Sequence, residues 1–268
     1  MASKYDYVFH CTVPKAASVW FSSLFAHEWV CASSGLRRVD FGYWLLEKTG
    51  TNAWQRIDGP PLDIAGEFPS RTLLSPVYCT PAYLSTLTKT VPNWAAVFVM
   101  RDPRDLIVSH YYSLRHSHPA VGSLDDFVSL RERLRSASLT DGMIDVMRQN
   151  VQVPYHGTMP EWQSLANRDS RVALVKFEDI FGSDQRGAVR RMFEHCDIRM
   201  DDTQLRQLLS AYRFEDFAGR PAGVEDVAAH WRKGIAGDWK RHFDDRLRNA
   251  YVEMFGDLPE RLGYEPTL

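Results

Sequence analysis

Three apolar runs, each followed by polar residues and then by a helical pattern, organise the hydrophobic positions of this chain. Aromatic residues occupy every second position of Tyr5–His10, which predicts a strand buried on at least one face. Ala95–Met100 is continuously apolar, and this pattern is typical of a strand covered on both faces. Arg171–Phe177 predicts another buried strand, and a central strand is expected near Arg71–Tyr78 in a region rich in Gly and Pro.

Helical spacing of apolar residues follows these runs. It begins at Ser18, which is well suited to cap a helix, and again near Leu106, after an acidic residue and a proline. Further helices are predicted over Leu124–Arg135, from Thr140, and over most of the chain after Asp184. Strands that alternate with helices predict an α/β fold with a central parallel sheet, in which ligands lie beyond the carboxyl ends of the strands.

The length of 268 residues is sufficient for one large α/β domain, and we predict a single domain over residues 1–268. The net charge of −2 argues against a general nucleic-acid binder, so any basic site must be local. No run has the length and purity of a membrane span, and the first residues lack the apolar core of a signal peptide. The four cysteines have no metal-binding spacing, which predicts reduced thiols and a cytoplasmic protein.

The loop between the first strand and its helix has the features of an anion site. A helix that follows a strand through small residues leaves backbone N–H groups unpaired at the positive end of its dipole. Lys15 adds a positive charge at this end, and Ser18 adds a hydroxyl donor. The nucleotide-kinase pattern GxxxxGK[ST] is not met, because Lys15 is followed by Ala16 and Ala17. A solvated lysine in an ordinary loop is the alternative on this stretch alone.

Two further clusters of basic residues favour the anion site over the solvated lysine. Arg101 follows a buried strand, and Ser109 lies two turns into the next helix, so the pair can hold one phosphate from two sides. A self-paired charge cluster that caps a helix is the alternative for this segment. Arg232, Lys233 and the backbone of Gly234 form a third cationic loop that an anion can approach closely. Three anion sites in a nearly neutral chain suggest a ligand with phosphates at two ends.

Three segments of the chain are CTVPKAASVW, VMRDPRDLIVSHYYSLR and WRKGIAGDWKRHF. In their order and their separations, they resemble the nucleotide-binding signatures of the sulfotransferases that use 3′-phosphoadenosine-5′-phosphosulfate (PAPS). The segment VKFEDI resembles the family segment that contains an adenine contact. The resemblance spans nearly the whole chain, and its RKGxxGDWK string is specific. It implies an enzyme that transfers a sulfuryl group from PAPS to a hydroxyl, less commonly an amine, of a small molecule, with release of 3′,5′-bisphosphoadenosine (PAP).

The resemblance also implies roles for individual residues. In the first segment, Lys15 and Ser18 would contact the 5′-phosphate and the departing sulfuryl group, with Lys15 neutralising the leaving oxygen. The cofactor-binding residues that we predict are Lys15, Ala16, Ala17, Ser18, Val19, Trp20, Arg101, Ser109, Phe177, Phe214, Arg232, Lys233 and Gly234. Of these, Arg101, Ser109 and the third loop would hold the 3′-phosphate, whereas the three aromatic residues would form the adenine slot. For each aromatic residue, packing in the core is the alternative.

The chain departs from the family pattern at the general base. The family's Lys-Thr-His-Leu-Pro segment, whose His accepts the proton of the acceptor, corresponds here to Val77–Pro81, which contains neither His nor Lys. Glu67 and His118 are the alternative candidates, since a carboxylate or a neutral imidazole can serve within hydrogen-bond reach. Ala16 and Ala17 replace the usual Ser-Gly of the first loop. Because Ala17 would be strained at positive φ, we expect that loop to follow a slightly different path.

Two rival functions remain at this stage. A kinase of nucleotides or small molecules would require Mg²⁺ and ATP, and the absent GxxxxGK[ST] pattern argues against it. A degenerate family member would bind nucleotide or a partner without turnover, and the missing His is its support. We expect no metal, no nucleic acid and no membrane partner, and the oligomeric state stays open. The acceptor pocket is expected in the Pro- and aromatic-bearing loops from Tyr43 to Tyr83.

Overall fold

The computed structural model places most of the chain, which divides into two compact units. The residues that the structure describes are 2–50, 68–119, 124–152 and 156–268. The first unit comprises Met1–Met100 and Thr158–Tyr212, and the second comprises Arg101–Gly157 and Arg213–Leu268. Each is described separately below. A single domain over residues 1–268 stays a prediction.

A five-stranded parallel sheet forms the centre of the first unit. Its order is β2 (Arg37–Val39), β3 (Thr72–Tyr78), β1 (Tyr7–Thr12), β4 (Trp94–Met100) and β5 (Val172–Lys176). Every pair of neighbours runs in parallel, as the alternation of strands and helices predicted. Every residue of β4 is buried, because apolar side chains face helices on both sides of the sheet. β2 was not predicted, since three residues with two arginines carry no strand pattern.

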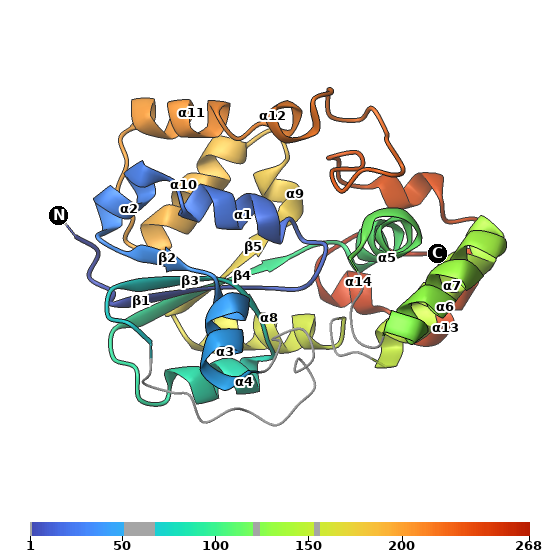
Figure 1. The fold of residues 1–268 in the computed structure, drawn as a ribbon, viewed down its shortest axis with the longest axis horizontal. Helices are drawn as coiled ribbons and strands as arrows, with labels where there is room; N and C mark the ends of the chain where they lie inside the picture. Colours follow the sequence, from blue (N-terminus) through green and yellow to red (C-terminus); the bar gives the residue numbers. More distant parts are fainter. Residues whose placement is uncertain (1, 51–67, 120–123, 153–155) are drawn as a thin grey trace. The chain divides into compact units, whose positions relative to one another are not determined.

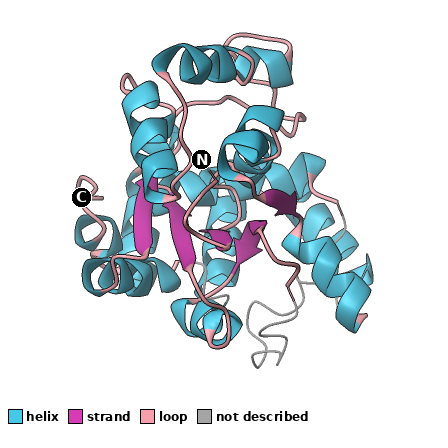
Figure 2. Cartoon of the chain, turned by 90° about the vertical axis from the view of Figure 1, so that its left-hand side faces the viewer, coloured by secondary structure: helices cyan, strands magenta, loops and turns pink. Residues whose placement is uncertain are grey.

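Helices cover both faces of this sheet (Figures 1 and 2). On one face lie α1 (Ser18–Phe25), α2 (Glu28–Ser34) and α10 (Gln185–His195), and on the other lie α3 (Phe41–Thr49), α4 (Pro81–Thr88) and α8 (Thr158–Arg168). The short α9 (Phe177–Ile180) follows β5, and α11 (Asp202–Ser210) packs on α10. α1 buries six of its eight residues, which fixes the helix on the sheet and thereby fixes the loop that precedes it.

The second unit is built from helices. They are α5 (Pro103–Tyr112), the π-helix η2 (Ser113–Ser117), α6 (Leu124–Ser136), α7 (Leu139–Gln152), α12 (Phe214–Ala218), the 3₁₀-helix η3 (Asp238–Arg241), α13 (Asp245–Phe255) and α14 (Leu258–Arg261). Their core contains Ile107, Tyr111, Met147, Trp239 and Leu247. Trp239 therefore anchors in this core the loop that begins at Arg232.

The starts of two helices test the predicted caps. Asp102 caps α5 by accepting a hydrogen bond from the backbone N–H of Arg104, and Pro103 is the first helical residue, as predicted. The cap predicted for α1 is wrong, because Ser18 is the first residue inside the helix. Its N-cap is Ala17, which makes no side-chain capping bond.

Within the described residues, no helix combines the length and the apolar character that crossing a lipid bilayer requires.

Candidate functional site

The loop between β1 and α1 has a backbone suited to binding an anion. Lys15 and Ala17 both adopt the left-handed conformation, with φ of 70° and 61°. Ala17 thus adopts the positive φ at which strain was predicted, and the slightly different path expected for this loop stays a prediction. Alternation between left- and right-handed residues can turn N–H groups toward one side and form an anion-binding concavity. Within this loop, the N–H of Ala16 donates to the carbonyl oxygen of Val13 at 3.4 Å. Lys15 is half-buried on this loop.

The hydroxyl group of Ser18 is held in place by a tyrosine. Tyr78, the last residue of β3, donates a hydrogen bond of 2.7 Å from its phenol to Ser18 Oγ. Ser18 is only 9% exposed. The next residue, Val19, is 47% exposed, so its backbone N–H rather than its apolar side chain is the group that could bind an anion. Sequence reasoning missed Tyr78, because β3 carries its phenol to this loop through the sheet.

Two of the residues predicted for the adenine slot are connected through a third aromatic side chain. Trp20 is 1% exposed and donates from Nε1 to the carbonyl oxygen of Tyr212 at 2.7 Å. Its ring lies 5.0 Å from that of Phe181, which in turn lies 4.4 Å from the ring of Phe177. Phe181 was not predicted, although it stands only one helical turn after Phe177 and the spacing could have indicated it.

In the second unit, a single carboxylate joins the start of α5 to the loop that follows Arg232. Asp105 accepts from the backbone N–H of Gly237 at 2.7 Å and from that of Trp239 at 2.8 Å. It also pairs with Arg101 at 3.4 Å. Arg101 Nη2 donates to the carbonyl oxygen of Ile235 at 3.1 Å. Two of the predicted phosphate-binding segments therefore meet, and sequence reasoning did not identify Asp105, the residue that joins them.

Arg104 has a different role from Arg101. Its guanidinium group is fully buried, forms two hydrogen bonds with the carboxylate of Asp102 at 2.9 and 2.8 Å, and lies 3.7 Å above the ring of Trp239. Asp102 and Arg104 thus form the self-paired cluster that was the alternative interpretation of this segment. Arg101 is oriented instead toward the backbone at Ile235.

Asp238 brings together the two cations of the last predicted segment. Arg232 donates to Asp238 Oδ2 and Lys233 donates to Oδ1, each at 2.5 Å. His242 lies 3.2 Å from the same carboxylate, and Arg232 also pairs with Glu225. Burial alone would raise the pKa of Asp238, but hydrogen bonds from its cationic partners hold that pKa well below its usual range.

The ion pairs of Arg232 and Lys233 leave N–H groups that can donate to a bound anion. A guanidinium group has five N–H donors and an ammonium group has three. The bonds to Glu225 and Asp238 engage two N–H groups of Arg232 and one of Lys233. The other N–H groups can donate to phosphate oxygens without breaking these pairs.

Gly234 allows the same loop to pass close to an aromatic ring. Its φ is 69°, and a Cβ atom built there would lie 2.3 Å from Cδ2 of Phe214. No other residue type fits this space without displacing the ring or the loop. The structure thus places Phe214 against the predicted phosphate-binding loop. Ser109 is partly exposed on α5, about two turns after Arg101.

Of the two candidate general bases, Glu67 lies outside the described residues. His118 follows η2 and is half-buried, with its Nδ1 at 2.7 Å from the carbonyl oxygen of Pro119. Since a carbonyl group only accepts, Nδ1 carries the hydrogen, and Nε2 is the basic atom of the neutral ring.

Among the described residues, one group has side chains close enough to share a metal ion. The ligand atoms of Glu225, Asp238 and His242 lie within 4.8 Å of one another. Arg232 and Lys233 already neutralise its two carboxylates. This group therefore has the chemistry of a buried ion-pair network rather than that of a cation site.

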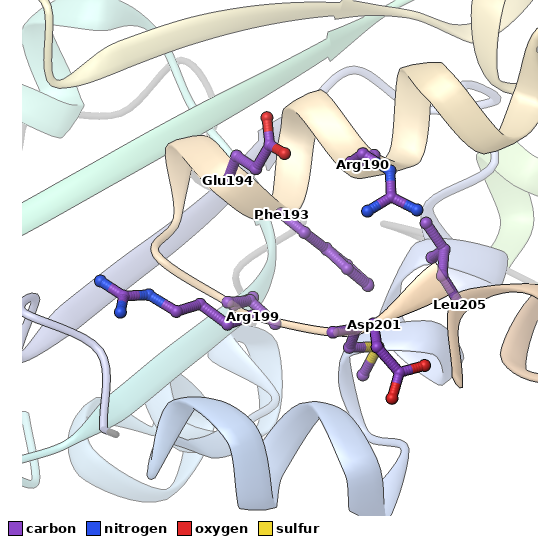
Figure 3. A pocket seen from close by; sticks show the side chains of 8 residues that line it. Arg190, Phe193, Glu194, Arg199, Asp201 and Leu205 are labelled. Atoms are coloured by element: carbon purple, nitrogen blue, oxygen red, sulfur yellow. The ribbon is translucent and has the colours of Figure 1, made fainter. Parts of the chain in front are cut away.

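A cavity of about 240 Å³ lies between α10 and α11, away from the residues discussed above. Phe193 extends from α10 into this space toward Leu205 of α11 (Figure 3). Its rim is charged and carries Arg190, Glu194, Arg199 and Asp201. None of the residues that line this cavity is a predicted site residue, so it plays no part in the candidate site.

Comparisons with known proteins agree with the motifs. The sequence model of the family described as sulfotransferase domain matches residues 70–263. Sulfotransferase 1E1 of Mus musculus is 25% identical over 178 residues, which are 61% of this chain and 54% of that protein. Sulfotransferase 1C2 of Homo sapiens is 20% identical over 270 residues, 94% of this chain and 83% of that protein. The chain spans about half the length of the first curated relatives it matches.

Solved structures share the fold. Mouse sulfotransferase SULT7A1 complexed with PAP aligns with a TM-score of 0.62 at 15% identity, over 97% of this chain and 86% of that chain. Retinol dehydratase in complex with androsterone and PAP aligns with a TM-score of 0.57 at 16% identity, over 95% and 80%. The family match covers most of the chain and includes the Arg101 and Arg232 segments. The chain therefore belongs to the sulfotransferase domain family.

Proposed function

We propose that this protein is an enzyme that transfers the sulfuryl group of PAPS to a hydroxyl, less commonly an amine, of a small-molecule acceptor. The observation that carries the proposal is the bond between Arg101 and the Ile235 carbonyl, together with Asp105. These contacts bring the second and third cationic segments together, as a single 3′-phosphate requires. The PAP in the complex of SULT7A1 and the androsterone in that of retinol dehydratase are consistent with such a nucleotide and acceptor.

The chemistry needs positioning and fixed positive charge. The acceptor oxygen attacks the sulfur in line, the bridging S–O bond breaks, and negative charge builds on the leaving phosphate oxygen. Lys15 and the N–H groups of the β1–α1 loop would stabilise that charge. Trp20 and Phe177 are 1% and 5% exposed, so they would bind adenine only after the side chains that cover them move aside. The proton of the acceptor would go to Glu67 or to Nε2 of His118, and Glu67→Gln and His118→Gln variants assign the base by their loss of kcat.

Binding and turnover test the proposal separately. Isothermal titration with PAP should give a saturable 1:1 isotherm, and incubation with PAPS and a panel of hydroxylated acceptors should give sulfated products and PAP. Lys15→Ala should lower kcat by roughly 100-fold while the far-UV circular dichroism stays unchanged. Lys89→Ala is the matched control, because Lys89 is exposed at the end of α4 and lies outside the three predicted nucleotide-binding segments.

The rival functions predict different results. Mg²⁺-dependent binding of ATP with no binding of PAP would favour a kinase and overturn the proposal. Binding of PAP with no product from PAPS and any acceptor in the panel would favour an inert nucleotide binder.

All four cysteines are free thiols, as predicted, and we expect the enzyme to act in the cytoplasm.

A further inference from the structure

Tyr78 stands where the sheet delivers a side chain to the β1–α1 loop. It is the last residue of β3, and it is paired in register with Thr12, the last residue of β1. The two neighbouring strands thus end at the same level, and the chain turns into the loop directly after Thr12. A side chain at this position of β3 is therefore adjacent to the first turn of α1.

The backbone on both sides of Tyr78 is fixed by side chains of other elements. Arg38 donates two hydrogen bonds to the carbonyl oxygen of Ser75, at 3.1 and 2.7 Å. Trp162 donates from Nε1 to the carbonyl oxygen of Cys79 at 3.1 Å, and its ring stacks on that of Phe98 at 4.5 Å. The phenol of Tyr78 is consequently presented to Ser18 from a rigid strand rather than from a mobile loop.

The direction of the Tyr78–Ser18 bond leaves the serine proton available for another acceptor. A hydroxyl group has one hydrogen to donate and can also accept. Because Ser18 Oγ accepts from the phenol at 2.7 Å, its own hydrogen is left to be donated to another group. Ser18 is also the first residue of α1, where the backbone N–H groups face outward at the positive end of the helix.

Other groups near Tyr78 are poorly suited to this role. The thiols of Cys11 and Cys79 lie 3.8 Å apart, and burial raises the pKa of Cys11 well above its usual value. A protonated, buried thiol neither carries charge nor makes a strong hydrogen bond. Val77, at the place of the family's lysine, has no polar group. In this segment the phenol is the group that reaches the loop through a strong hydrogen bond.

We propose that Tyr78 is a positioning residue for sulfuryl transfer, acting through Ser18. This inference rests on the proposed function. The phenol holds Ser18 Oγ so that the serine hydroxyl donates to the 5′-phosphate oxygen of the nucleotide. During transfer, the bond between the acceptor oxygen and sulfur forms, the bridging S–O bond breaks, and its electron pair stays on that phosphate. The acceptor proton goes to the general base, and Tyr78 keeps its own proton throughout.

A double-mutant cycle on PAP affinity tests the coupling without knowledge of the acceptor. Tyr78→Phe removes one oxygen and should weaken PAP binding about tenfold in titration calorimetry, the worth of one well-placed hydrogen bond. In the Ser18→Ala background the same change should weaken binding less than about twofold, since the coupled partner is gone. Melting temperatures of all four proteins report whether each is folded. Tyr7→Phe, at the opposite end of neighbouring β1, is the matched control and should leave the affinity unchanged.

The outcomes are distinguishable. Equal losses in both backgrounds would mean that Tyr78 acts by packing alone and would overturn the positioning role. No loss in either background would overturn it as well. A wild-type protein that binds no PAP would overturn the proposed function and this inference with it, whereas a wild type that binds PAP without coupling between Tyr78 and Ser18 overturns only the inference.

Discussion

The two regions predicted to bind anions are stabilised in opposite ways. The β1–α1 loop relies on its backbone, because left-handed Lys15 and Ala17 orient N–H groups and Tyr78 fixes the one hydroxyl. The loop from Arg232 relies on charge, since carboxylates hold its cations. The first region needs a particular conformation, and the second needs neutralisation of its positive charges before any ligand arrives. Substitutions should therefore affect the first mainly through backbone strain and the second mainly through uncompensated charge.

The largest expected effect comes from the charge-based region. Asp238→Asn leaves Arg232 and Lys233 buried with one acidic partner fewer, so the free energy of unfolding should fall by roughly 3–5 kcal/mol. Urea denaturation monitored by circular dichroism measures this change. As a control, Asp257→Asn breaks an exposed pair with Arg261 and should cost less than about 1 kcal/mol. Equal effects of the two variants would contradict the distinction drawn between the regions.

The second prediction tests the close approach at Gly234. Gly234→Ala would place a Cβ atom 2.3 Å from Phe214 at a φ of 69°, so the loop or the ring must shift. We expect the affinity for PAP to fall by about 100-fold, measured by titration calorimetry. Gly219→Ala has nearly the same φ, 67°, but open space around its Cβ position, and it separates backbone strain from collision. Comparable losses in both variants would contradict a role for the Phe214 contact.

The third prediction concerns the pH dependence of folding stability, to which each unit contributes one buried histidine. Burial lowers the pKa of His10 in the first unit and of His156 in the second to about 3. Between pH 6.5 and 3 the unfolded chain binds these protons and the folded chain does not, so stability is lost as pH falls through this window. At pH 5 each histidine should cost about 2 kcal/mol relative to pH 7.5, measured by urea denaturation. Stability that rises on acidification to pH 5 would contradict this result.

The smallest effect is expected at Ala17. Alanine in the left-handed conformation is strained by about 1 kcal/mol, so Ala17→Gly should raise the free energy of unfolding by up to that amount. Ala26→Gly is the matched control, because Ala26 ends the same helix with a right-handed φ of −84°. It should lower stability by about 0.5–1 kcal/mol. Changes of the same sign in both variants would show that the φ of Ala17 stores no strain.

How much the sequence could predict differs between the regions for physical reasons. The strands β1, β4 and β5 were predicted from the local apolar pattern, whereas the nucleotide-binding roles of Arg101 and Arg232 come from the family's motifs and stay predictions. Asp105, in contrast, reads in the sequence as part of a charged cluster, and its bonds to Gly237 and Trp239 join residues far apart in the chain. Tyr78 likewise reaches Ser18 only because the sheet aligns the ends of β3 and β1.

Asp105 has a consequence for how the length of this chain can vary. One side chain fixes a loop that begins more than 120 residues later, so the position of that loop does not depend on the length of the polypeptide between them. Insertions and deletions between Asp105 and Arg232 can therefore change the length of the chain while these two bonds still hold the loop to the start of α5.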